Sequence, residues 1–175
     1  LVQTEDYVAA DELFDANYAY FSSTSSSWLA HAKTYSQKLT KKLDLNKNSF
    51  VIEVASNDGY LLKNFVASGV PCLGIEPTDS TAAAAEKLGV PVLREFFGEN
   101  LGKQLAEEGR QADLIVGNNV YAHVPDINDF TFGLKAALKP GGTITLEFPH
   151  LMELIKYNQF DTVYHEHFSY LSLLT

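Results

Sequence analysis

The sequence has little cysteine, few basic residues and no long apolar run. Cys72 is the single cysteine among 175 residues, which excludes an internal disulfide and a thiolate zinc cluster. Its apolar surroundings in VPCLGI predict a buried, inert thiol. The 13 basic residues against 22 acidic ones give a net charge of −9, without a basic stripe. Nucleic acid and acidic membranes are therefore poor partners, and a neutral or cationic small ligand suits the chain better.

The chain also lacks the features of a membrane or secreted protein. No stretch of about eighteen apolar residues is present, and the acidic start LVQTEDYVAADELFD lacks the basic region of a signal peptide. We therefore expect a cytoplasmic protein whose length suits one domain. The chain begins at Leu1 and ends in the apolar SYLSLLT. These ends predict that it is the central piece of a longer protein.

The first clear element is a helix after a serine-rich loop. The loop FSSTSSS provides side chains that can cap a helix N-terminus. Trp28, Ala32, Tyr35, Leu39 and Leu43 then follow at alternating four- and three-residue spacings. This spacing predicts an amphipathic helix with its lysines on the other face.

From residue 50 onward, short apolar runs alternate with helical patterns. Strands are predicted at 50–56, 71–77, 90–93, 112–119 and 143–149, and helices at 61–69, 80–89 and 127–138. A turn over residues 139–142, of sequence KPGG, separates the last helix from the last strand. The alternation predicts βαβ units, and so an α/β fold with an open, doubly wound, Rossmann-like parallel sheet.

In such a sheet the ligand lies beyond the carboxyl ends of the strands. The turn EVASNDG after the first strand lacks the glycines of a G-x-G-x-x-G dinucleotide fingerprint, which weakens a phosphate-binding interpretation. It offers instead the acceptors Glu53, Asn57 and Asp58, with Gly59 as a flexible backbone position. This set suits a cationic ligand that carries an amino-acid group.

Two further strand ends would face the same crevice. Glu76, in GIEP, is placed to accept hydrogen bonds from both hydroxyls of a ribose, although an isolated strand-end glutamate is more often a solvated loop residue. Asn118, Asn119 and His123 follow the fourth strand, where asparagine alone is more often a turn residue.

Taken together and in order, the motifs EVASNDG, GIEP, DLIVGNN and LKPGG resemble the class I S-adenosylmethionine-dependent methyltransferases. The sequence ASNDG departs from the glycine-rich turn that is more frequent in that family. With GNNVYAHVPDINDF, EFPHL and FDTVYHEHFSYLSL, the chain looks like the C-methyltransferases that act beside a ketone on a nucleotide-linked deoxysugar. Members of that group are longer, with an N-terminal zinc-binding domain and a C-terminal domain that helps to hold the nucleotide sugar.

The resemblance implies an organisation and a cofactor. Residues 1–49 would form an N-terminal lid and helix, residues 50–150 the cofactor-binding core, and residues 151–175 an active-site segment that ends before the last strands. S-adenosylmethionine would be the cofactor and a nucleotide sugar the substrate. The expected cofactor contacts are Glu53, Ser56, Asn57, Asp58, Gly59, Glu76, Pro77, Asn118 and Asn119.

The resemblance also assigns catalytic roles. Methylation of carbon needs a base at the α-carbon and stabilisation of the enolate. His167, in YHEHFSY, would be the base, and Tyr164 and Glu166 would shape its site. His123 would hold the keto oxygen or share the proton transfer. Tyr18 matches a position that folds over the active site as a lid, and a core position for it is equally compatible with the sequence.

Other interpretations of these residues remain open. The histidines of HEH could bind zinc weakly, but no third ligand is evident, so we expect no metal. Glu147 and His150 could touch substrate, although a strand-end pair satisfied within the fold is favoured. An O- or N-methyltransferase of another small molecule, or a cofactor-binding module without turnover, are the alternative functions.

Overall fold

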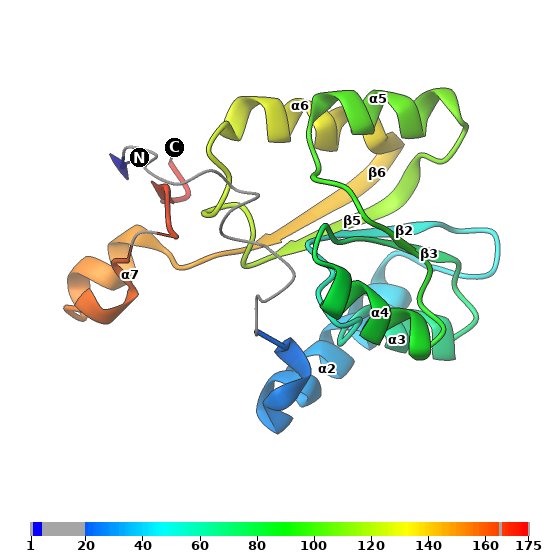
Figure 1. The fold of residues 1–175 in the computed structure, drawn as a ribbon, viewed down its shortest axis with the longest axis horizontal. Helices are drawn as coiled ribbons and strands as arrows, with labels where there is room; N and C mark the ends of the chain where they lie inside the picture. Colours follow the sequence, from blue (N-terminus) through cyan, green and yellow to red (C-terminus); the bar gives the residue numbers. More distant parts are fainter. Residues whose placement is uncertain (1, 5–19, 165, 175) are drawn as a thin grey trace.

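A computed structural model describes residues 2–4, 20–164 and 166–174 of the chain. Its central layer is a parallel five-stranded sheet in the order β4-β3-β2-β5-β6, which confirms the predicted α/β fold (Figure 1). The strands are β2 (Val51–Val54), β3 (Cys72–Ile75), β4 (Val92–Leu93), β5 (Ala112–Asn118) and β6 (Leu138–Glu147).

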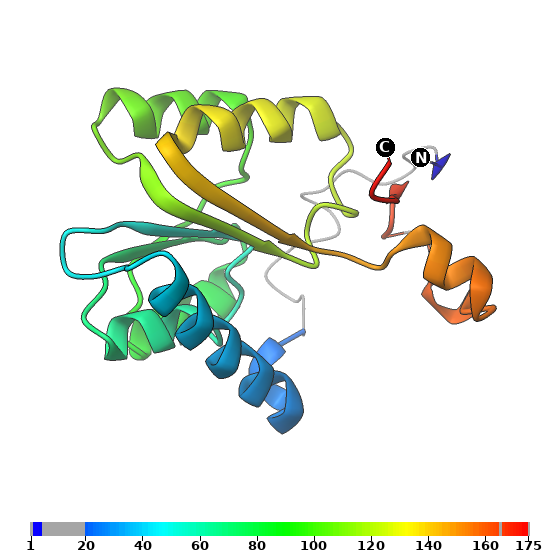
Figure 2. The ribbon, with the colours of Figure 1, turned by 180° about the vertical axis from the view of Figure 1, so that it is seen from behind.

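Helices cover both faces of this sheet, as Figures 1 and 2 show. One face carries α5 (Glu99–Glu107) and α6 (Ile127–Ala137); the other carries α2 (Ser26–Lys42), α3 (Leu62–Ala67) and α4 (Asp79–Lys87). Each face has its own apolar cluster, one around the fully buried Phe65 and the other around Leu105 and Ile115. The molecule is therefore a three-layer sandwich.

The predicted helix after the serine loop is α2. The Ser25 hydroxyl accepts a hydrogen bond from the Trp28 amide at 3.3 Å, as expected for a serine N-cap. Ala32 and Leu39 are buried, and Trp28, Tyr35 and Leu43 pack against the same cluster. The apolar stripe seen in the sequence thus binds α2 to the sheet.

Two features differ from the sequence prediction. Helix α5 is not predicted, because the stretch from 94 to 111 is polar and contains three glycines, which lower helix propensity. Strand β6 begins at Leu138, whereas the prediction starts it at Thr143. Leu138 pairs with Ala112 and Thr143 pairs with Leu114, so the predicted turn is present as a bulge inside the strand.

The strand order fixes where a ligand crevice can form. The chain builds outward from β2 through β3 to β4 and then returns to the opposite side of β2 with β5. The reversal point lies between β2 and β5, and crevices form outside the carboxyl ends of strands at such a point. Cys72 lies in β3, where burial raises the pKa of its thiol to about 11.

The segment after β6 returns to this same end of the sheet. It contains α7 (Leu151–Lys156), η2 (Phe160–Thr162) and β7 (Ser169–Tyr170), and β7 pairs antiparallel with β1 (Val2–Gln3). In Figure 1, α7 and the two ends of the chain lie beyond the carboxyl ends of β5 and β6. The described residues include no helix with the length and apolar character needed to cross a bilayer.

Candidate functional site

A cavity of about 650 Å³ opens at the reversal point between β2 and β5. Its wall includes Val54 and Ala55 at the end of β2, together with residues that follow β3, β4 and β5. Nine of the residues predicted to form the site line it: Asn57, Glu76, Pro77, Asn118, Asn119, His123, Tyr164, Glu166 and His167. The structure thus brings the predicted cofactor and catalytic residues to one cavity.

The other predicted residues lie elsewhere. Glu53, Ser56 and Asp58 are buried behind the wall. Ser56 lies against Gly74, where an added Cβ would come within 2.3 Å of the serine hydroxyl. Gly59 has a φ of +75° and packs against α4, so its role in the structure is the turn itself. Tyr18 lies outside the described residues.

Buried acceptors without a partner gather near the ends of β2 and β5. Among the residues that the structure describes, both carboxylate oxygens of Glu53, Oδ1 of Asp58 and Oδ1 of Asn118 find no partner at hydrogen-bond distance. Burial raises the pKa of Glu53 well above its usual value; the Tyr60 hydroxyl opposes this shift, and the Glu76 and Asp58 carboxylates add to it. Unpaired buried acceptors are costly, and a ligand ammonium group carries the N–H donors that this region lacks.

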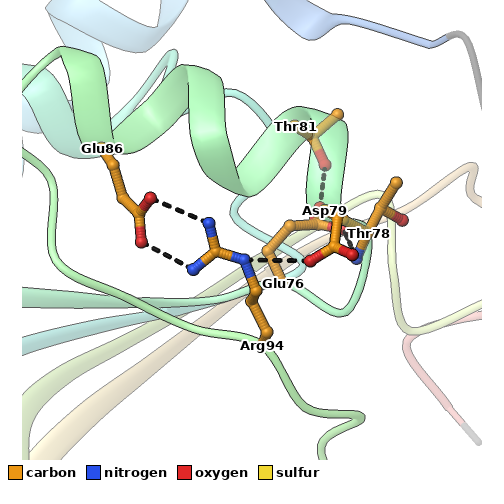
Figure 3. Close-up of polar contacts among 6 residues, drawn as sticks. All are labelled: Glu76, Thr78, Asp79, Thr81, Glu86 and Arg94. Atoms are coloured by element: carbon orange, nitrogen blue, oxygen red, sulfur yellow. Dashed lines mark hydrogen bonds and ion pairs between the residues drawn. The ribbon is translucent and has the colours of Figure 1, made fainter. Parts of the chain in front are cut away.

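Glu76 is held at the cavity wall by backbone donors. Its Oε2 accepts from the Asn57 amide and its Oε1 from the Thr78 amide, both at 2.9 Å. Figure 3 shows how the loop after β3 is braced: Arg94 binds Glu86 and Asp79 of α4. The carboxylate is therefore pre-positioned, and its remaining lone pairs can accept ribose hydroxyls.

Aromatic residues complete the cavity in ways that the sequence patterns did not indicate. Trp28 from α2 stacks on Tyr60, with ring centroids 5.9 Å apart, and the Tyr60 hydroxyl accepts from the side-chain Nδ2 of Asn118 at 3.4 Å. Phe96 and Phe97 follow β4 and also line the cavity. The sequence does contain one indication of this role: Phe96 and Phe97 come shortly after a short strand, where ligand-contacting residues are expected.

Backbone hydrogen bonds bring the catalytic segment against the loop after β5. The amides of Phe168 and Ser169 both donate to the Ala122 carbonyl, at 2.8 and 3.2 Å. This contact sets the His167 ring 4.7 Å from the His123 ring and perpendicular to it. The Tyr164 ring also packs against the His167 ring, with ring centroids 4.2 Å apart.

The environment of His167 favours a neutral ring with one available lone pair. Its Nδ1 lies 3.0 Å from the Thr162 carbonyl, which can only accept, so Nδ1 carries the proton and Nε2 the lone pair of the neutral ring. Burial lowers the pKa of His167 below its ordinary 6.5, against smaller opposing effects of Thr162 and Glu166. The ring is therefore a base at neutral pH.

The two neighbours of His167 are neutral hydrogen-bonding groups. Burial, followed by the charge of His167, lowers the pKa of His123 to about 4. Burial and the carboxylate of Glu166 raise the pKa of Tyr164, so its hydroxyl stays protonated. Near pH 7 this corner of the cavity therefore presents one base beside two groups that can hydrogen-bond to a developing oxyanion.

Glu147 and His150 each have a hydrogen-bond partner near the end of β6. Oε2 of Glu147 lies 3.2 Å from Nε2 of His31 on α2, and Nε2 of His150 accepts from the Leu173 amide at 3.3 Å. Both side chains thus have a partner within the fold, in agreement with the interpretation that the sequence favours.

A parallel sheet with this reversal point and a carboxylate after its second strand is typical of the Rossmann-like proteins that bind nucleotide cofactors. Within that class, a family model described as "Methyltransferase domain" matches residues 28–175, and the chain belongs to this family. S-adenosylmethionine is its cofactor, and the unpaired acceptors behind the cavity together with Glu76 fit the ammonium and ribose groups of that molecule.

Named relatives extend this picture. The C-methyltransferase NovU of Streptomyces niveus is 34% identical over 173 residues, which are 99% of this chain and 41% of that protein. The chain thus spans less than half the length of this relative. A solved S-adenosylmethionine-dependent methyltransferase from Archaeoglobus fulgidus has the same fold, with a TM-score of 0.59 at 15% identity over 82% of this chain and 64% of its own. The glycopeptide N-methyltransferase MtfA, solved with S-adenosylmethionine, gives 0.51 at 14% identity over 66% and 53%.

Proposed function

We propose that the protein methylates a carbon atom next to a ketone on a nucleotide-linked deoxysugar. The observation that carries this proposal is the neutral His167, whose Nδ1 is bonded to the Thr162 carbonyl and whose ring lines the cofactor cavity. Transfer of a methyl group to oxygen or nitrogen starts from a lone pair and has less need of a base. Transfer to carbon requires that a C–H proton leave first. The likeness to a relative named a C-methyltransferase agrees with this choice.

In this mechanism His167 Nε2 takes the α-proton, and the electrons of the C–H bond move into the carbonyl group as an enolate. The Tyr164 hydroxyl and the neutral His123 ring hydrogen-bond to the developing oxyanion, while the charge of Glu166, which acts on His167, stabilises the imidazolium that forms. The bound cofactor supplies an electrophilic methyl group. Asn118, Asn119, Glu76 and Pro77 line the cavity at the strand ends, and we assign them to cofactor contacts.

A proton-exchange experiment tests the carbon chemistry separately from methyl transfer. The full-length protein is incubated in D₂O with a nucleotide-linked keto-deoxysugar and S-adenosylhomocysteine, and NMR follows deuterium at the α-carbon. We expect exchange at one α-position. With S-adenosylmethionine, the same position should gain a methyl group. A methyl group found on oxygen or nitrogen would contradict the proposal, as would cofactor binding without any exchange or transfer.

We place this activity in the cytoplasm, in line with the unpaired cysteine.

The Glu76 assignment gives a prediction of its own. Glu76→Ala is expected to weaken cofactor binding by about 1–3 kcal/mol, because the ribose hydroxyls lose a charged acceptor. Calorimetric titration should show the same loss for S-adenosylmethionine and S-adenosylhomocysteine, which share the ribose. Glu107→Ala, an exposed carboxylate at the end of α5, is the matched control and should bind normally. Unaltered affinity of the Glu76 variant would remove this residue from the ribose site.

A further inference from the structure

The turn after β2 contains an asparagine in a backbone conformation that favours glycine. Asn57 has a φ of +49° and Ala55 a φ of +56°, so two residues without a glycine's freedom, one on each side of Ser56, adopt left-handed conformations. Asparagine tolerates this region better than most residues do, but glycine would adopt it without strain. The asparagine side chain at position 57 should therefore make contacts that glycine could not make.

The Asn57 side chain forms hydrogen bonds with residues that are distant in the sequence. Its Oδ1 accepts from the Ser22 amide at 2.9 Å, and its Nδ2 donates to the Tyr20 carbonyl at 3.0 Å. Next to it, Asp58 Oδ2 accepts from the Ser23 amide at 3.1 Å. These three bonds fasten residues 20–23, here named the strap, to the turn between β2 and α3. Ser22 is buried at 7% exposure, so its own bond to Asn57 is partly shielded from water, whereas the bond to the Tyr20 carbonyl is exposed.

The strap forms part of the cavity wall beside the predicted ribose carboxylate. Tyr20 and Ser22 line the cavity together with Asn57 and Glu76. The backbone amide of Asn57 donates to Glu76 Oε2 at 2.9 Å, while its side chain holds the strap. One residue thus joins the N-terminal wall of the cavity to its carboxylate, and Oδ1 and Nδ2 of its side chain each bind a backbone group of the strap.

We propose that Asn57 is a positioning residue whose side chain fastens the strap across the cofactor end of the cavity, so that bound S-adenosylmethionine is retained. Asn57 acts through residues 20–23 and not by a side-chain contact with the cofactor. This explains why asparagine stands in the turn where a glycine would be enough for the backbone. The proposal depends on the cofactor of the family and is independent of the atom that receives the methyl group.

The test compares Asn57→Gly with wild type in the full-length protein. Glycine keeps the left-handed backbone and the hydrogen bond from the backbone N–H of residue 57 to Glu76. It removes the two side-chain hydrogen bonds to the strap. Stopped-flow binding of S-adenosylmethionine should show a dissociation rate constant increased about 10-fold, from the loss of two hydrogen bonds. The association rate constant should also increase, because a released strap no longer narrows the path. Amide hydrogen exchange at Ser22 and Ser23 in the cofactor-free protein should accelerate.

Asn158→Gly is the matched control. Asn158 has a φ of +50° beyond α7 and does not line the cavity, so it reports the effect of an asparagine-to-glycine change in the same backbone conformation. Its cofactor kinetics should equal those of wild type. Faster dissociation of Asn57→Gly with unchanged association and unchanged Ser22 and Ser23 exchange would overturn the proposal in favour of a direct cofactor contact. Wild-type kinetics and exchange would overturn it as well.

Discussion

Replacement of His167 by asparagine is expected to lower turnover by about 10²- to 10⁴-fold, the contribution typical of a general base. Affinity for S-adenosylmethionine should stay unchanged. Asparagine can still donate an N–H to the Thr162 carbonyl, as Nδ1 of His167 does at 3.0 Å, but it has no basic nitrogen in place of Nε2. The variant therefore keeps the hydrogen bond that orders the segment and loses the lone pair that takes the proton.

The measurement is single-turnover methylation with saturating cofactor, together with α-proton exchange in D₂O. Both rates should fall in parallel, because both require the same proton transfer. His31→Asn is the matched control: this histidine bonds Glu147 from α2, does not line the cavity and should be dispensable for turnover. Methylation by His167→Asn at the wild-type rate would exclude His167 as the base.

The pH dependence of turnover adds an independent check on the same assignment. Burial lowers the pKa of His167 below 6.5, so the ring remains neutral and basic down to mildly acidic pH. We expect turnover to be constant above pH 6.5 and to decrease as pH falls through the lowered pKa, where the protonated ring can no longer accept. The residual turnover of His167→Asn should lack this decrease.

The sheet and the strand-end residues could be predicted because simple rules control them. Buried parallel strands appear as short apolar runs, and the reversal of strand order places residues such as Glu76 and Asn118 at one end of the sheet. Helix α5 could not be predicted in the same way. An added Cβ at Gly102 would come within 2.3 Å of the Gly133 carbonyl oxygen, so the close approach of α5 and α6 requires a residue that weakens the helical pattern.

The remaining parts of the site depend on contacts between distant loops. The strap reaches Asn57 and Asp58 over about 35 residues of sequence, and no local pattern encodes such a pairing. The placement of His167 beside His123 depends on two amides that share the Ala122 carbonyl. Each of these contacts has a backbone atom on at least one side, and backbone atoms are the same at every position of a sequence. Residue types could therefore suggest the chemistry of this corner but not its geometry.

The buried His123 should make the protein sensitive to acid, and His123→Gln should reduce that sensitivity. Burial, followed by the charge of His167, lowers the pKa of His123 from 6.5 to about 4. Between these two values the unfolded chain binds a proton at this position and the folded chain does not, so stability falls as pH falls. The free energy of unfolding should drop by about 3 kcal/mol between pH 6.5 and pH 4 through this residue alone.

Glutamine keeps a polar side chain that does not titrate, so denaturant unfolding at a series of pH values should give His123→Gln a shallower decrease than wild type. The effect of Glu53, whose pKa is raised, has the opposite sign and is common to both proteins. An equally steep decrease in the variant would show that folding does not lower the pKa of His123, and burial would then give no support to its assigned role as a neutral hydrogen-bonding partner of the enolate oxygen.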